Sequence, residues 1–422
     1  MTALQSNHAS LPQTLPTAQT PPTPYMGLAP FLRMSIAGID LSPVAQTLLA
    51  QVEQNPDDAN LWMNLSIATM CLDQRDLGLT LQAQALALQR IYHLAATTQP
   101  ARLRLLVLMV AGDLSANTPL ECLLENGDID LDFYYVTPGN PLALALPAHD
   151  VLIVAMSESD ENRSLLRSLA QLLAGWPQPV INAPQHIAAV GRDVASSLLQ
   201  QVPGLCMPPT LRASRAVLQA IVTGATHLSV AFNGCDFPVI VRPLGSQAGR
   251  DLAKIENAEA LAHYLDRIHE TEFFISRFID YSGSDGLFRK IRVALIDGQP
   301  FVCHMAVSSH WMIHYVNAGM YEEANKREEE VAFMTTFADF AQRHQDALAA
   351  IAQRTRLDYL LIDCAQTPDG QLLVFEIDHA MVVHAMDLED QFPYKQIHML
   401  KVKNAFRDYL FRLTSAQPQS PV

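Results

Sequence analysis

The chain has 422 residues, of which 49% are hydrophobic, and it carries a formal net charge of −15. This length is enough for two or three domains with a sizeable core. The net acidity argues against a general nucleic-acid binder, which needs a basic surface. No apolar run reaches the length of a membrane helix, and the N-terminus lacks the basic start and apolar block of a signal peptide. We therefore expect a cytoplasmic protein with no nucleic-acid or membrane partner. The six cysteines form no CxxC pair and are expected to be reduced thiols: Cys71, Cys122, Cys206, Cys235, Cys303 and Cys364.

Two N-terminal segments, residues 1–24 and 25–98, differ in pattern. The first is rich in Pro, Thr and Gln without apolar periodicity, so a disordered tail is expected. From Leu41 to about Ala96 apolar residues recur at helical spacing, and Trp62 lies in a stretch with roughly the spacing of a tetratricopeptide repeat. One such unit cannot form a solenoid, since several must stack. A helical cap packed against an enzyme is favoured, and recognition of a peptide partner stays open.

Strands alternating with helices are expected between residues 99 and 205. This alternation predicts a parallel sheet with loops at its carboxyl edge. The loop at residues 111–119 follows the first of these strands, and we expect it at a domain interface that serves an acceptor substrate. A second phosphate-binding loop is the alternative. The predicted strands lie at residues 104–110, 132–136, 149–154 and 179–182, with helices ending near residue 124 and spanning 161–173.

A short strand at residues 237–243 runs into a glycine-bracketed loop at residues 244–250. The strand is rich in β-branched residues and ends near a cation, Arg242. Gly245 and Gly249 allow the loop to expose backbone N–H groups and let phosphates approach closely. Alone such a loop is weak evidence, because turns of glycine and serine are common.

Residues 357–387 predict a hairpin that carries three carboxylates. Two apolar runs flank a turn with Pro, Asp and Gly at residues 368–370. Asp363 lies at the end of the first strand, and alternation puts Glu376 and Asp378 on one face of the second. Three converging carboxylates repel one another unless a cation lies between them, and hard oxygen ligands of this kind suit Mg²⁺. The alternative is a hairpin with solvated acids at its rim.

The order of these features resembles the ATP-grasp superfamily, which includes glutathione synthetase, D-alanine–D-alanine ligase and peptide-modifying glutamate ligases. The resemblance covers residues 103–413. It implies an α/β protein with α+β lobes: an ATP-grasp domain at 206–416, made of an ATP lid lobe at 206–271 and a metal- and substrate-binding lobe at 272–416. A Rossmann-like domain would precede it, and a short tail at 417–422 would follow.

The resemblance also implies how ATP is held. Residues 272–280 look like the family's apolar hinge strand, whose backbone bonds the adenine edge. The glycine loop would close over the phosphates, and the cation at the end of the preceding strand would contact them. The residues expected to bind ATP are Arg242, Gly245, Ser246, Gln247, Gly249, Ser276, Arg277 and Phe278.

Two arginines are assigned catalytic roles by the same resemblance. Arg242 would hold a phosphate, and Arg292 would steady the γ-phosphate or acyl-phosphate, with a solvated basic strand start as the alternative. Asp363, Glu376 and Asp378 would hold one or two Mg²⁺ ions. The sequence departs from the family pattern twice, since Arg242 stands where Lys is usual and Asp378 stands where Asn is usual. Neither change removes a necessary type of charge.

Histidines flank the predicted metal strand on both sides. His304, His310 and His314 include a His-x3-His pair on a possible helix, but no Cys or Glu joins them at the spacing of a zinc site. Substrate contact or core packing is therefore favoured over zinc, and one of the later histidines would take a proton from an attacking amine. Substrate contacts are expected from His304, His310, His314, His379, His384 and Asp387.

These features predict an ATP-dependent ligase that joins a carboxylate to the amine of an amino acid or peptide through an acyl-phosphate. Two alternatives stay open. One is phosphotransfer to a hydroxyl or another acceptor on the same fold. The other is a nucleotide-binding interaction module without ligase turnover, whose helical N-terminal part presents a partner. The first two differ in whether ADP release requires both a carboxylate and an amine, whereas a binding module has ATP affinity without turnover.

Overall fold

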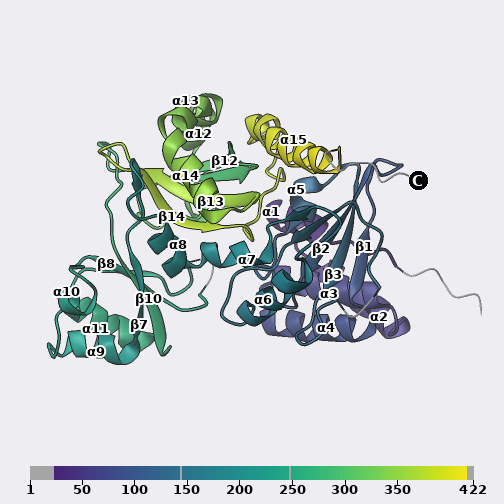
Figure 1. Ribbon diagram of the computed structural model, residues 1–422, viewed down its shortest axis with the longest axis horizontal. Helices are drawn as coiled ribbons and strands as arrows, with labels where there is room; N and C mark the ends of the chain where they lie inside the picture. The colour runs from purple at the N-terminus through teal and green to yellow at the C-terminus, as the bar shows by residue number, and fades with distance from the viewer. Residues whose placement is uncertain (1–22, 143–144, 247–248, 416–422) are drawn as a thin grey trace, which may run out of the picture.

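The computed structural model describes residues 23–142, 145–246 and 249–415, and within these ranges the chain forms three sheets covered by helices (Figure 1). An α/β fold with a largely parallel first sheet, two further α+β lobes and a helical N-terminal region is confirmed. Three predictions fall wholly or mostly outside the described residues: the tail at 1–24, the tail at 417–422 and the role of Gln247.

The first sheet has the strand order β1-β3-β2-β4-β5. The parallel pairing predicted for its central strands is confirmed, and β1 pairs antiparallel with β3 at one edge. The expectation of helix up to about Ala96 was wrong at β1, because Ile-Tyr-His-Leu is a short segment that buries Tyr92 against the sheet. The strands are β1 (Ile91–Leu94), β2 (Leu103–Met109), β3 (Ile129–Tyr135), β4 (Val151–Val154) and β5 (Val180–Ile181).

Helices cover both faces of this sheet. Leu105 and Val107 of β2 share one hydrophobic cluster with the N-terminal helices, whereas Leu106 and Leu108 face the opposite cluster, because side chains alternate along a strand. The first face carries α1 (Ala29–Ile36), α2 (Ser42–Gln54), α3 (Ala59–Cys71), α4 (Arg75–Leu88) and α5 (Leu120–Leu124). The other carries α6 (Arg163–Leu172), α7 (Pro184–Ile187) and the 3₁₀ helix η1 (Ala188–Val190). The next helix, α8 (Arg192–Leu198), contacts β7 (Thr210–Ser214) of the second sheet and β14 (Leu372–Asp378) of the third. The N-terminal helices are therefore a layer of this domain, in agreement with a helical cap (Figure 1).

The second sheet belongs to the predicted lid lobe and has the order β7-β10-β8-β9, with every pair antiparallel. One face packs on helices and has its own hydrophobic cluster, which includes Val241, Leu261 and Phe273. The opposite face is therefore left to line a cleft. The elements are β7 (Thr210–Ser214), β8 (Val239–Pro243), β9 (Ala253–Ile255), β10 (Glu272–Arg277), α9 (Arg215–Val222), α10 (Leu228–Ala231) and α11 (Ala258–Arg267).

The third sheet has the order β12-β11-β13-β14-β6, in which β13 and β14 form the predicted hairpin. A possible helix spanning His310 and His314 is absent from the described residues there, since these residues lie in a loop that ends in the 3₁₀ helix η2 (Tyr315–Asn317). The strands are β6 (Leu205–Cys206), β11 (Phe288–Ile296), β12 (Gln299–Ser308), β13 (Tyr359–Gln366) and β14 (Leu372–Asp378). The helices are α12 (Ala324–Thr335), α13 (Phe337–Arg343), α14 (Gln345–Thr355) and α15 (Pro393–Ser415).

Two features join the third sheet to the first. The long α15 packs its residues Met399, Val402 and Phe406 into the cluster shared with the N-terminal helices (Figure 1). The buried Asn182, just after β5, donates to the Tyr359 carbonyl at 2.9 Å and accepts from the Tyr359 backbone N–H at 3.0 Å. These contacts fix the first domain behind the third sheet. No helix within the described ranges is long and apolar enough to span a membrane.

Candidate functional site

A cleft lies between the exposed face of the lid sheet and the third sheet. Alternation places Arg242, Phe274 and Ser276 on the lid face that is turned away from the helices, and all three line the cleft. Lys290 of β11 and Glu376 of β14 line it from the opposite side. The cleft therefore brings together the predicted hinge, the strand-end cation and the acidic hairpin.

The hinge supplies an aromatic wall to this cleft. Phe278 follows β10 directly, and its backbone N–H donates to the Pro238 carbonyl at 3.0 Å. The Lys254 ammonium lies 4.1 Å from the Phe278 ring centroid, and the Trp311 ring packs edge-on against Phe278 at 5.7 Å. Flat apolar groups beside backbone polar groups suit a planar base. The predicted hinge contacts, Ser276, Arg277 and Phe278, all line the cleft.

Arg242 is buried at the end of β8, with 6% of its surface exposed. Its Nη2 donates to the backbone carbonyl and, at 3.2 Å, to the hydroxyl of Ser246 in the glycine loop. Its Nε has no hydrogen-bond partner among the described residues. Burial, with repulsion from Arg192, lowers the pKa of Arg242 to about 10. A buried cation with an unused donor is a candidate partner for an anion.

The glycine loop itself is held close to the opposite lobe. Gly245 and Gly249 adopt φ angles of +71° and +69°, the left-handed region that favours glycine. A Cβ at Gly249 would collide with the imidazole of His314, which also lines the cleft. The absence of a side chain therefore lets the loop and the His314 segment approach each other.

Four polar residues lie side by side in a row across the third sheet. The strand register pairs His304 with Arg292, Arg292 with Asp363, and Asp363 with Glu376. Asp363 has no exposed surface, and Arg292 donates hydrogen bonds to both of its oxygens, from Nε at 2.7 Å and from Nη2 at 3.0 Å. The Lys290 ammonium adds an ion pair at 2.7 Å. Asp363 is thus shared between two cations.

These cations set the charge of both carboxylates. Burial alone would raise the pKa of Asp363, but Arg292 and Lys290 outweigh it and hold that pKa far below its usual value. Burial would likewise raise the pKa of Glu376, but Arg192, at the start of α8, forms an ion pair with it and lowers that pKa. Asp363 and Glu376 are therefore both ionised, each with a counterion supplied by the chain.

Two of the three predicted Mg²⁺ ligands, Asp363 and Asp378, are not placed to bind a metal ion in this arrangement. Both oxygens of Asp363 are already engaged by Arg292 and Lys290. Asp378 is not beside Asp363 in the register but pairs with Leu361, and it accepts from the Ala380 N–H at 3.0 Å. Within the described part of the chain, no three His, Cys, Asp or Glu residues are grouped to hold a metal ion. The magnesium site stays a prediction.

The predicted substrate residues fall into three environments. His304 and His314 lie near the row of Arg292 and Asp363, and burial lowers the pKa of both imidazoles. His310 is exposed on its loop. The remaining three follow β14 into a segment packed against the first domain and α15: His379, His384 and Asp387.

His379 joins the acidic strand to the first domain. It is fully buried, and its Nε2 lies 2.9 Å from the Met156 carbonyl, so this nitrogen carries the proton. Its Nδ1 has no hydrogen-bond partner among the described residues and lies 3.6 Å from Asp378 Oδ1. Two acceptors thus face each other at the end of β14.

Sequence reasoning missed a buried ionic network under the cleft. Lys395 of α15, 2% exposed, lies 3.1 Å from Asp387 and 3.8 Å from the buried Glu330. Glu330 also accepts from the Tyr315 hydroxyl at 2.7 Å. The network anchors the segment around His314, and nothing in the local pattern near Lys395 signals it. Arg192 was also missed as a site residue.

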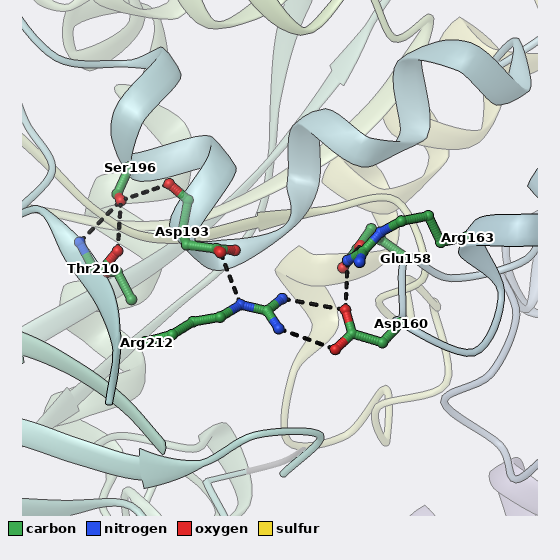
Figure 2. A network of polar contacts seen from close by, with 7 residues as sticks. All are labelled: Glu158, Asp160, Arg163, Asp193, Ser196, Thr210 and Arg212. Carbon is green, nitrogen blue, oxygen red and sulfur yellow. Dashed lines mark hydrogen bonds and ion pairs between the residues drawn. The ribbon is translucent and has the colours of Figure 1, made fainter. Parts of the chain in front are cut away.

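A second network connects the lid lobe to the first domain (Figure 2). Arg212 of β7 donates to Asp193 at 2.9 Å and, through its two terminal nitrogens, to Asp160 at 3.0 and 3.2 Å. Beside it, Ser196 accepts from the Thr210 backbone N–H at 2.9 Å. These contacts tie the lid strand nearest the first domain to α8 and to the loop before α6.

No family model matches the chain. It is similar in structure to D-alanine–D-alanine ligase from Bacillus anthracis complexed with ATP, at 14% identity over 75% of this chain and 99% of that chain, with a TM-score of 0.46. A RimK domain protein ATP-grasp from Sphaerobacter thermophilus matches at 16% identity over 73% and 99%, with a TM-score of 0.41. ATP-grasp ligase PsnB complexed with minimal precursor, Mg and ADP matches at 14% identity over 74% and 98%, with a TM-score of 0.43.

Proposed function

We propose that the protein is an ATP-dependent ligase that joins a carboxylate to an amine through an acyl-phosphate. The observation that carries the proposal is Arg242, a buried cation whose Nε has no partner among the described residues and which lies near a second cation, Arg192. The same cleft has an aromatic hinge at Phe278. A base at the hinge and phosphates at the two arginines match the two ends of ATP.

The chemistry needs two steps. A carboxylate oxygen of the acid attacks the γ-phosphorus of ATP, the bond to the bridging oxygen breaks, and ADP leaves. The amine nitrogen then attacks the acyl carbon, inorganic phosphate leaves, and the nitrogen loses a proton. Arg242 neutralises phosphate charge in the first step, Arg292 adds its charge from the row beneath the cleft, where its nitrogens bond Asp363 and the Val382 carbonyl, and the glycine loop excludes water. Catalysis is thus chiefly positioning and electrostatics.

The acceptor is proposed to be an amino acid or a peptide. Nδ1 of His379 and Oδ1 of Asp378 are two acceptors 3.6 Å apart, an arrangement that is relieved by a group with N–H donors. An amine is such a group. His384 and Asp387 follow on the same segment and are proposed to contact the rest of the acceptor. An enzyme that consumes ATP suits a cytoplasmic location, where ATP is supplied.

The test is ADP release from ATP and Mg²⁺, screened across amino acids and short peptides supplied as acid and amine. Release that needs both a carboxylate and an amine is expected for the ligase. Release with a hydroxyl acceptor alone would instead identify a phosphotransferase. ATP that raises the melting temperature without any ADP release would identify a binding module. ATP at a hundred times its dissociation constant adds about 2.7 kcal/mol of stability, so unchanged melting would refute nucleotide binding itself.

A further inference from the structure

We infer that cations of the chain let this cleft bind the triphosphate of a nucleotide without a divalent metal ion. The inference rests on the proposed function and extends it to the way in which phosphate charge is neutralised. It comes from the pairing of the hairpin carboxylates, which an acidic hairpin alone does not predict.

Each carboxylate of the row, the buried Asp363 and the partly exposed Glu376, already has a counterion. Asp363 accepts hydrogen bonds from Arg292 through both oxygens and an ion pair from Lys290 at 2.7 Å. Glu376 pairs with Arg192. A divalent ion would have to displace Lys290 to reach Asp363, because both oxygens of that carboxylate are engaged by cations, whereas Glu376 pairs with Arg192 through Oε2 alone and retains Oε1 as a single ligand position.

The balance of charge then favours an anion. Five cations contribute to the cleft and the row beneath it, and they face the three carboxylates of the hairpin, which leaves two positive charges in excess: Arg192, Arg242, Arg277, Lys290 and Arg292 against Asp363, Glu376 and Asp378. A hairpin without these partners would repel a triphosphate until a metal ion screened it. Here the chain itself supplies that screening.

The cations also retain hydrogen-bond donors for phosphate oxygens. The Nε of Arg242 has no partner in the described ranges of the chain, although the side chain is only 6% exposed. The Lys290 ammonium has three donors and forms one ion pair, with Asp363, and it lines the cleft. Arg242 and Arg192 repel each other, which an anion between them relieves.

The experiment measures ATP affinity by calorimetry with the full-length protein, once in Mg²⁺ and once in EDTA. The dissociation constant in EDTA is expected to stay within about tenfold of that in Mg²⁺, that is, within about 1.4 kcal/mol. Inorganic tripolyphosphate in EDTA is expected to raise the melting temperature, because the phosphate chain rather than the base carries this affinity. Neither measurement depends on a variant that might fail to fold.

A pair of variants isolates the counterion of Asp363. Lys290→Met removes this counterion and is expected to weaken the affinity for ATP in EDTA more than tenfold. The affinity for ATP in Mg²⁺ is expected to fall less, because the metal ion can then take the place of the ammonium. Arg289→Met is the matched control. Arg289 is the next residue, but it pairs with Asp285 and Glu329 instead of the row. Its removal is expected to leave the ratio of the two affinities unchanged.

The outcomes separate this inference from the proposed function. ATP that binds in Mg²⁺ but more than tenfold more weakly in EDTA overturns the inference and leaves the ligase proposal standing. Tripolyphosphate that leaves melting unchanged in EDTA overturns it as well. If the ratio of the ATP affinities in EDTA and in Mg²⁺ is the same for Lys290→Met as for Arg289→Met, the counterion of Asp363 does not matter for ATP binding and the inference is refuted. Failure of ATP to bind in either buffer overturns the ligase proposal first.

Discussion

Replacement of Arg242 by Met is expected to move nucleotide affinity and stability in different directions. Arg242 is buried at 6% exposure, with an Nε that has no partner among the described residues and an Nη2 that bonds Ser246. Its charge is useful to an anionic ligand but unfavourable in the ligand-free fold. Met keeps an unbranched apolar stem at this position while it removes the guanidinium and its charge.

The magnitudes follow from the site. The lowering of the pKa of Arg242 from its ordinary value to about 10 corresponds to ~3 kcal/mol against the charged form in the ligand-free protein. Loss of the hydrogen bonds from the guanidinium to Ser246 costs about 1.5–3 kcal/mol. The two effects nearly cancel, so the melting temperature is expected to stay constant or rise slightly. Loss of a charged donor to phosphate weakens nucleotide binding by about 1.5–3 kcal/mol, or roughly 10- to 150-fold.

The assay combines thermal melting without nucleotide and calorimetry with ATP. Arg215→Met is the matched control in the same lobe, because its guanidinium donates to three backbone carbonyls, those of Leu265, Ile268 and Glu270. Arg215 does not line the cleft. The control is expected to lower the melting temperature while it leaves ATP affinity unchanged. The reasoning is refuted if Arg242→Met destabilises the protein as much as the control does, or if it binds ATP as tightly as the parent.

Three further predictions follow from the same contacts. Glu376→Gln keeps the size of the side chain but removes the charge that pairs with Arg192 beside the proposed phosphate site, and ADP release is expected to fall by about a hundredfold or more with the melting temperature retained; near-parental release would place the reaction elsewhere. Arg212→Leu breaks the network of Figure 2 and is expected to cost only about 1 kcal/mol, because its ion pairs are partly exposed, while hydrogen exchange in β7 speeds up; unchanged exchange would show that the network does not hold the lid. Removal of residues 1–22 should change neither melting nor turnover, whereas removal of residues 1–96 should give insoluble protein, since it strips a helical layer and β1 from a shared core; a soluble, active product of the longer cut would contradict the packing argument.

The local sequence pattern was sufficient to predict features that depend on residues close together in the chain, such as the face on which a side chain lies and the position of a turn. Alternation alone predicted that Glu376 and Asp378 share one face of a strand. The turn residues at 368–370 predicted the hairpin, and the register places Asp363 opposite Glu376 as expected. The same reasoning misplaced β1, because four residues are too few to distinguish a helical from an extended period.

The pairing of those side chains could not be predicted in the same way. Arg292 meets Asp363 because β11 and β13 are adjacent in the sheet, although 71 residues separate them in the chain. Arg192 reaches Glu376 across 184 residues, from a helix that belongs to a different domain. A pattern that is read one strand at a time therefore finds three carboxylates and infers a metal ion as the missing positive charge. The sheet order and the domain packing supply cations at the same place, so the kind of positive charge at an acidic hairpin is decided by tertiary contacts and not by the hairpin.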